Sequence, residues 1–112
     1  RVVVFLAELL TEHGVNVVIA ATAPKRSHRR LARDRIERFA EVYLDCSEDV
    51  CRRRDPKGLW KRADEGEITR LPGVGDPYEV PEAAEARVDT AGLSPEGAAL
   101  DVLAQLEKRG FF

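Results

Sequence analysis

The sequence predicts an α/β fold in which a parallel sheet lies between two layers of helices, a three-layer arrangement. Short apolar runs rich in β-branched residues alternate with helical segments, an order typical of parallel strands joined by right-handed crossovers. Serine residues stand where several helices would begin, and glycine residues stand where they would end. At 112 residues the chain has the length of one domain, which we assign to residues 1–112.

The first predicted elements are a helix and a buried strand. Apolar residues at helical spacing predict a helix up to His13, with Gly14 as its stop. Val15–Ala21, with the sequence VNVVIAA, is a nearly continuous β-branched run typical of a strand buried on both faces. The helix has no N-cap residue before it, and the chain contains no Met. We therefore expect a domain that is incomplete at its N-terminus. Because a strand as apolar as Val15–Ala21 needs neighbours on both sides, we also expect a further strand beside it.

A second helix and strand follow a loop that contains Pro24. Ser27 is expected to cap this helix, which continues to about Arg38. Phe39–Asp45, with the sequence FAEVYLD, is the second predicted strand. Ser47 is expected to cap a short helix whose first turn is acidic, the charge that a helix N-terminus favours.

The second half of the chain begins without a clear pattern and ends with a strand and a helix. A short helix is expected over about Leu59–Glu65, and the Pro- and Gly-rich stretch after it shows no periodicity. Ala86–Thr90 is the third predicted strand. Ser94 as N-cap and Pro95 at the first helical position begin a final helix that ends at Gly110.

Composition and charge narrow the function classes. The net charge is -2, so the overall charge favours neither nucleic acid nor an anionic membrane. No apolar run approaches the roughly 18 residues needed to cross a bilayer, and no secretory signal is visible. The two cysteines, Cys46 and Cys51, form no disulfide framework, which fits a reducing, cytoplasmic compartment. Because no third or fourth ligand stands near them, we expect no metal site in this chain.

One predicted helix is strongly basic. With the loop before it, this helix carries seven cations and only two carboxylates, and the cations are Lys25, Arg26, Arg29, Arg30, Arg33, Arg35 and Arg38. Such a patch can bind nucleic acid, but no aromatic residues that could stack on bases accompany it. We therefore interpret it as a solvated outer face.

The most specific pattern lies in the second half of the chain. RRRDPKGLWKRADEGEI begins at Arg52 and is followed by LPGVGDPYEVPE and DTAG. These runs resemble the C-terminal part of adenylylsulfate (APS) kinases, in which an Arg-Asp-Pro-Lys-Gly-Leu-Tyr-Lys run leads into a lid and then a Tyr-Glu-x-Pro-Glu sequence. Arg54–Leu59 matches without a break, Trp60 takes the Tyr place, and Tyr78–Glu82 matches as well. The resemblance covers essentially the whole chain and assigns the lid to residues 54–82.

The resemblance implies a P-loop NTPase fold of the nucleotide-kinase type. It also implies transfer of the ATP γ-phosphoryl group to the 3′-hydroxyl of adenylylsulfate, giving 3′-phosphoadenylylsulfate for sulfate assimilation. A cationic lid suits this chemistry, because phosphoryl transfer depends on positioning, charge neutralisation and exclusion of water. The implied ligands are adenylylsulfate and ATP with Mg²⁺, whose ligands would lie outside this chain. Neither nucleic acid nor a membrane is implied, and a homodimer or a fusion with ATP sulfurylase would fit the family.

Two sets of binding residues follow from the resemblance, position by position. The set that would hold adenylylsulfate comprises Thr22, Ala23, Lys57, Arg70 and Leu71. The set that would flank the adenine of ATP comprises Arg54 and Leu93. No catalytic residue is assigned.

Several positions depart from the family pattern, among them Pro72, where the family has a Thr. Ala23 stands where the family has a Ser that can be phosphorylated, Leu71 where it has a stacking Phe, and Gly75 where it has an Asp. The lost base stacking at Leu71 is worth roughly 1–3 kcal/mol. The Gly-x-x-Gly-x-Gly-Lys-Ser/Thr phosphate loop is absent as well, and with it the Ser/Thr that would bind Mg²⁺. We therefore expect these residues on their own to be inactive. Because Val15–Ala21 would lack a neighbouring strand, we also expect them to be poorly soluble, or ordered only where a longer chain surrounds them.

The departures leave two function classes open. An intact Arg54-Asp55 pair and Lys57 favour an adenylylsulfate kinase. The losses favour a degenerate nucleotide-binding or regulatory domain, fused to ATP sulfurylase, with little or no kinase activity. A phosphate-loop sequence encoded before Arg1 would discriminate between the two.

Overall fold

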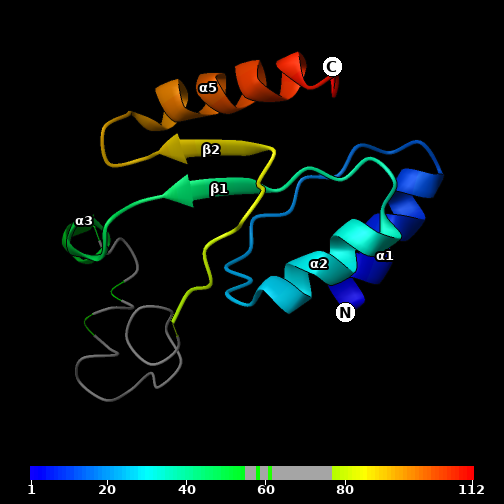
Figure 1. The fold of residues 1–112 in the computed structure, drawn as a ribbon, viewed down its shortest axis with the longest axis horizontal. Helices are drawn as coiled ribbons and strands as arrows, with labels where there is room; N and C mark the ends of the chain where they lie inside the picture. The colour runs from blue at the N-terminus through cyan, green and yellow to red at the C-terminus, as the bar shows by residue number, and fades with distance from the viewer. Residues whose placement is uncertain (55–57, 59–60, 62–76) are drawn as a thin grey trace.

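The structure is a computed structural model that describes residues 1–54, 58, 61 and 77–112. In chain order its elements are α1 (Val2–Glu12), α2 (Arg26–Arg35), β1 (Val42–Asp45), α3 (Glu48–Arg54), β2 (Ala86–Asp89) and α5 (Pro95–Lys108). Figure 1 shows that α5 runs along β2, whereas α1 and α2 lie together beyond β1. None of the described helices is long and apolar enough to span a bilayer.

The two strands form a parallel pair in the order β1-β2, so the predicted α/β architecture with a parallel sheet is confirmed. The register places Val42 opposite Ala86 and Asp45 opposite Asp89. In β2, Ala86 and Val88 are buried while Arg87 and Asp89 are exposed, because successive side chains of a strand point to opposite faces.

Helix α5 covers the outer edge of β2. The side-chain amide of Gln105 accepts a hydrogen bond from the Arg87 N–H at 3.1 Å and donates one to the Arg87 carbonyl at 3.0 Å. These two main-chain groups point away from β1 and would otherwise be left without a strand partner. Ala98 of the same helix is buried. A single glutamine therefore replaces one step of a strand ladder.

The predicted strand over Val15–Ala21 is wrong, because residues 15–24 form no strand. A strand needs a neighbouring ladder, and in the described part of the chain only β1 and β2 pair. The N–H of Val15 instead donates to the Leu10 carbonyl at the end of α1, at 3.0 Å. Val18 is 96% exposed, so this apolar run does not occupy the core.

The start of α2 differs from the prediction because a distant carboxylate caps it. The helix begins at Arg26, one residue before Ser27, and Lys25 at the N-cap makes no side-chain cap. The N–H of Arg26 donates to Oε1 of Glu79 at 3.0 Å, from 53 residues away in sequence. A negative charge at this end also suits the helix dipole. Ser27 therefore lies inside the first turn and is not the cap.

The end of α2 and the start of β1 are also shorter than predicted. The helix stops at Arg35, since Ile36 is already extended, and the ladder of β1 begins at Val42. The N–H of Glu41 donates to Oε1 of Glu85 at 2.8 Å. Because a side chain occupies this donor, residues 39–41 do not extend the strand.

The remaining predicted caps are confirmed. Ser47 Oγ accepts from the Val50 N–H at 3.4 Å at the start of α3, and Ser94 Oγ accepts from the Gly97 N–H at 3.1 Å at the start of α5. Pro95 occupies the first position of α5. Gly110 has a φ of +82°, the left-handed conformation that terminates a helix. The short helix predicted over 59–65 lies outside the described residues, except at Lys61.

Candidate functional site

The carboxyl ends of β1 and β2 lie side by side and carry two of the predicted binding residues. Helix α3 follows β1 and ends at Arg54, and a turn from Thr90 to Leu93 follows β2. Thr90 binds the Asp45 carbonyl through its N–H at 2.9 Å and through its hydroxyl at 3.1 Å. Nη2 of Arg54 donates to the Ala91 carbonyl at 3.5 Å, and Leu93 is 40% exposed. The structure thus brings Arg54 and the turn with Leu93 to one edge of the sheet.

A second loop, Thr22–Pro24, carries Thr22 and Ala23. Thr22 is exposed, whereas Ala23 and Pro24 are half-buried. The Pro24 carbonyl accepts from the Glu79 N–H at 2.9 Å, which joins this loop to the Tyr78–Val80 segment. Ala23 has a φ of +40°, in a region that costs a non-glycine residue about 1–2 kcal/mol. The surrounding contacts therefore hold the loop in a shape that it would not adopt alone.

Arg29 of α2 makes most of those contacts. Its Nη1 donates to the Ala23 carbonyl at 2.7 Å, and its Nη2 donates to the Glu79 carbonyl. Nε lies 2.6 Å from Oε2 of Glu41 in an ion pair. The guanidinium also covers the ring of Tyr78 at 5.1 Å from its centroid. The Arg29 side chain is only 9% exposed, so the prediction of a solvated outer face is wrong for this residue.

The neighbouring arginines of α2 differ in exposure. The Arg30 side chain is 81% exposed and pairs at 4.0 Å with Asp34 of the same helix, as a solvated face predicts. Arg33 forms two short contacts with Glu85, Nη2–Oε1 at 2.7 Å and Nη1–Oε2 at 2.9 Å. Arg29 and Arg33, one turn apart, thus face the sheet, while Arg30 faces solvent.

Glu85 and Arg33 are coupled through their charges. Burial raises the pKa of Glu85, but the hydrogen bonds from Arg33 and from the Glu41 N–H outweigh it, so the pKa lies below its ordinary value. The same hydrogen bond to Glu85 raises the pKa of Arg33. Both groups are therefore charged at neutral pH.

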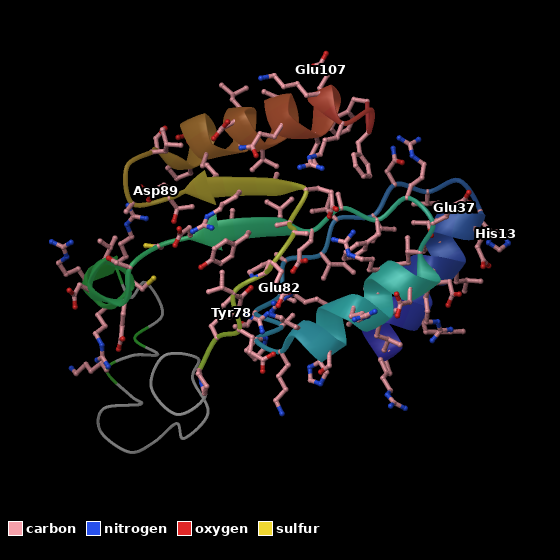
Figure 2. The ribbon with its side chains drawn as sticks, in the orientation of Figure 1. His13, Glu37, Tyr78, Glu82, Asp89 and Glu107 are labelled. Carbon is pink, nitrogen blue, oxygen red and sulfur yellow. The ribbon has the colours of Figure 1, made fainter. Side chains whose placement is uncertain are left out.

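Two tyrosines connect Arg29 to the sheet. The rings of Tyr78 and Tyr43 are stacked, with centroids 5.9 Å apart and an interplanar angle of 11°. Arg87 covers the Tyr43 ring at 5.2 Å and pairs with Asp45 at 2.7 Å. Burial and the nearby Asp45 carboxylate raise the pKa of Tyr43. Figure 2 shows Tyr78 and Glu82 in the space between β1 and the N-terminal end of α2.

A groove of about 550 Å³ lies beside α2, along the stretch from Pro81 to Ala83. Its cations face carboxylates: Arg26 lies 3.9 Å from Glu82, and Arg29 and Arg33 both contact Glu41.

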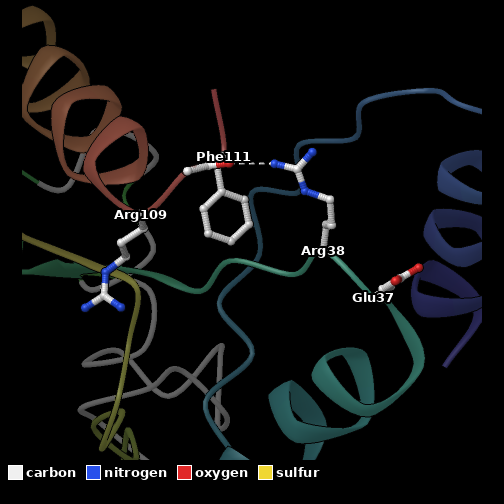
Figure 3. A pocket seen from close by; sticks show the side chains of 5 residues that line it. Glu37, Arg38, Arg109 and Phe111 are labelled. Atoms are coloured by element: carbon white, nitrogen blue, oxygen red, sulfur yellow. Dashed lines mark hydrogen bonds between the residues drawn. The ribbon is translucent and has the colours of Figure 1, made fainter.

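A smaller hollow of about 150 Å³ lies near the C-terminus (Figure 3). There Arg38 donates a hydrogen bond to the Gly110 carbonyl at 2.9 Å and covers the Phe111 ring at 5.7 Å from its centroid. The groove is thus lined by internal ion pairs, and the smaller hollow by a hydrogen bond and a cation–ring contact.

Three predicted binding residues, Lys57, Arg70 and Leu71, lie outside the described residues, and so does Gly75. Within the described ranges, no group of three or more His, Cys, Asp or Glu side chains could hold a metal ion. Cys46 and Cys51 are both free thiols. The pKa of Cys51 is raised, mainly by burial and to a smaller extent by the neighbouring Cys46 thiol.

Comparison with known families and sequences gives a consistent result. A family model described as adenylylsulphate kinase matches residues 1–89. The chain is 44% identical over 108 residues to an adenylyl-sulfate kinase of Synechococcus sp. (strain JA-2-3B'a(2-13)), covering 96% of the chain and 61% of that protein. It is 38% identical to a probable adenylyl-sulfate kinase of Pyrococcus abyssi, covering 99% of the chain and 64% of the relative. The chain therefore spans about three fifths of the length of these curated relatives.

A larger relative and a solved structure extend the comparison. A probable bifunctional SAT/APS kinase of Sorangium cellulosum is 38% identical over 107 residues, which are 96% of the chain and 18% of that protein. The solved structure is the Mycobacterium tuberculosis APS kinase CysC in complex with AMPPNP and APS, with a TM-score of 0.87 and 37% identity. The match covers 96% of the chain and 64% of that structure.

Proposed function

Because the chain belongs to the adenylylsulfate kinase family, we propose that it serves transfer of the ATP γ-phosphoryl group to adenylylsulfate. The product would be 3′-phosphoadenylylsulfate. The names of its relatives support this activity, and so does the similar M. tuberculosis APS kinase, whose structure was solved in complex with both AMPPNP and APS.

The observation that carries the proposal is the contact between Arg54 and the turn after β2. Arg54 reaches the Ala91 carbonyl at 3.5 Å, two residues before Leu93, at the carboxyl edge of both strands. Ligands of open α/β sheets bind at this edge. A guanidinium and an apolar side chain on one edge suit a flat heteroaromatic ring, which stacks on a cation and packs against methyl groups. We assign the adenine of ATP to Arg54 and Leu93.

The Thr22–Pro24 loop is the second part of the proposed site. We assign Thr22 and Ala23 to adenylylsulfate, together with Lys57, Arg70 and Leu71 by resemblance. Ala23 offers no hydroxyl that could be phosphorylated. The phosphoryl group would therefore pass directly from ATP to adenylylsulfate, in line, without a phosphoenzyme at this position. The described residues offer no ligand set for Mg²⁺, and no step is assigned to the ion.

A nucleotide-binding domain without efficient transfer is a second candidate function. The absence of a hydroxyl at Ala23 favours it, and the bifunctional relative supports a fusion of this domain type with a sulfurylase. Binding would still use Arg54, Leu93, Thr22 and Ala23.

The test is a coupled assay on the protein at its natural length, with ATP, Mg²⁺ and adenylylsulfate. Formation of 3′-phosphoadenylylsulfate, lost when adenylylsulfate is omitted, supports the kinase. Binding of both nucleotides without product supports the second candidate, and absence of both binding and product contradicts the two proposals.

In an active protein, Arg54→Ala should raise the KM for ATP about tenfold, because the variant loses one contact between a charged group and the nucleotide. Arg53→Ala, on the neighbouring exposed residue of α3, is the matched control.

A further inference from the structure

We propose that Arg29 is a positioning residue for the adenylylsulfate site, because it fixes the Thr22–Pro24 loop against the Tyr78–Val80 segment. The proposal rests on the function proposed above, in which Thr22 and Ala23 contact adenylylsulfate. Arg29 itself acts through the main chain of the loop, and it belongs to neither of the two sets of binding residues.

One guanidinium joins the two segments. Nη1 donates to the Ala23 carbonyl at 2.7 Å and Nη2 donates to the Glu79 carbonyl, so two nitrogens of one planar group hold two main-chain oxygens. The planar fork sets the spacing of these oxygens, which a flexible ammonium group cannot do. The direct link between the segments is the hydrogen bond from the Glu79 N–H to the Pro24 carbonyl at 2.9 Å.

The Arg29 side chain is itself held from three sides. Its Cα belongs to α2, its Nε lies 2.6 Å from Glu41, and its guanidinium covers the ring of Tyr78 at 5.1 Å. Glu41 is 14% exposed, so this ion pair is largely withdrawn from water. A side chain held in this way restricts the loop without needing to order itself first.

The loop needs such a restraint because of its backbone conformation. Ala23 has a φ of +40°, which L-residues rarely adopt, and no glycine stands there to lower the cost. Without the hydrogen bond from Arg29, the peptide after Ala23 can turn toward a common conformation. The Thr22 side chain and the Ala23 methyl group would then leave the positions that we assign to adenylylsulfate.

The neighbouring residue supplies a matched control. Arg30 has the same side chain one position further along α2, but it is 81% exposed and pairs only weakly with Asp34 at 4.0 Å. Replacing Arg30 removes the same charge from the same helix and leaves the Thr22–Pro24 loop untouched. Any effect of net charge on anionic nucleotides will therefore appear in both variants.

The first experiment is steady-state kinetics on the full-length protein, with each substrate varied in turn. Arg29→Ala should raise the KM for adenylylsulfate at least tenfold while the KM for ATP changes less than about twofold, and Arg30→Ala should change neither. Arg29→Lys keeps the charge beside Glu41 but loses the fork, so it should fold and show an intermediate increase. An equal rise in both KM values, or an unchanged KM for adenylylsulfate in folded Arg29→Ala or Arg29→Lys, would overturn the proposal.

The second experiment separates this proposal from the proposed function. Hydrogen exchange of the Glu79 amide should accelerate at least tenfold in Arg29→Ala, whereas exchange of the Gly97 amide on α5 should stay within about threefold. This readout needs no turnover, so it decides the role of Arg29 in the loop even if the wild-type protein forms no product. An unchanged rate at Glu79 would overturn the positioning role, and an equal acceleration at Gly97 would reveal general destabilisation instead.

Discussion

Arg33 and Glu85 form a two-point ion pair across 52 residues of sequence, with Nη2–Oε1 at 2.7 Å and Nη1–Oε2 at 2.9 Å. Glu85 stands directly before β2 and also accepts from the N–H of Glu41, directly before β1. One carboxylate thus ties α2 to the starts of both strands. Its side chain is 14% exposed, so solvent screens this carboxylate weakly.

Glu85→Gln should lower the free energy of unfolding by about 1–3 kcal/mol. Gln keeps the size of the side chain but removes the charge and one of the acceptors that the Arg33 fork requires. Urea unfolding measures the change. Glu82→Gln is the matched control, because Glu82 is 83% exposed and lies 3.9 Å from Arg26, so its loss should cost less than about 0.5 kcal/mol. Equal effects of the two substitutions would contradict this account of Glu85.

The same carboxylate makes stability depend on pH. Burial raises the pKa of Glu85, but Arg33 and the Glu41 N–H lower it further, so the folded-state pKa lies below the unfolded-state value of about 4.3. The stabilisation is then complete above the unfolded-state pKa and is lost as the pH falls through the folded-state pKa. The free energies of unfolding of wild type and Glu85→Gln, measured with urea, should therefore differ most above the unfolded-state pKa of about 4.3 and approach each other as the pH falls below it. A difference that grows on acidification would refute the sign.

Ser94→Ala should lower the free energy of unfolding by about 1 kcal/mol, because Ser94 Oγ accepts from the Gly97 N–H at the start of α5. Ser27→Ala should change it by less than about 0.5 kcal/mol, since exposed Ser27 lies inside the first turn of α2 and caps nothing. Thermal unfolding of both variants tests the two assignments together. A larger loss for Ser27→Ala than for Ser94→Ala would restore the prediction made from sequence.

Lys57→Ala should weaken adenylylsulfate binding by roughly 1.5–3 kcal/mol, the range for a charge-assisted contact, and should change ATP affinity far less. Lys57 lies outside the described residues, so this prediction rests on the family resemblance alone. Calorimetric titration with each nucleotide measures both affinities. Equal losses for the two nucleotides would remove Lys57 from the adenylylsulfate set.

Incubation with γ-labelled ATP should leave no label on residues 22–26. Ala23 has no hydroxyl, and Thr22 is the one residue of this short segment that could accept a phosphoryl group. Peptide mapping after the incubation measures the label, with Thr22→Val as the control for background. Stoichiometric labelling of Thr22 would show a phosphoenzyme and contradict direct transfer.

Local patterns predicted the ends of the last helix and missed the start of α2. Ser94 and Pro95 act on main-chain groups within three residues, so the sequence contains all the information for that cap. The cap of α2 is the carboxylate of Glu79, 53 residues away, and no local pattern contains it. The strand predicted over Val15–Ala21 is wrong for a related reason. A β-branched composition favours an extended backbone, but a strand forms only where another strand lies beside it.

The resemblance predicted binding residues but gave no role to Arg29. The seven cations near one helix predict a single solvated face, and that prediction holds for Arg30. Arg29 and Arg33 lie four residues apart on one side of the helix, where like charges repel unless carboxylates stand opposite. The four-residue spacing of these arginines, in a chain that also contains Glu41, Glu79 and Glu85, is the sequence signal that could indicate ion pairs on this side of the helix. The partners themselves could not be chosen without the fold.

The stacked pair of Tyr43 and Tyr78 has an optical consequence. The chain contains two tyrosines, and both belong to this one contact between β1 and the Tyr78–Val80 segment. The tyrosine contribution to the near-ultraviolet absorbance and circular dichroism, after the overlapping contribution of Trp60 is subtracted, therefore reports a single junction instead of an average over the molecule. Because the pKa of Tyr43 is raised by burial and by Asp45, the ionisation of its phenol also reports on that junction. The protein thus contains its own chromophore at the place where two sequence-distant segments meet.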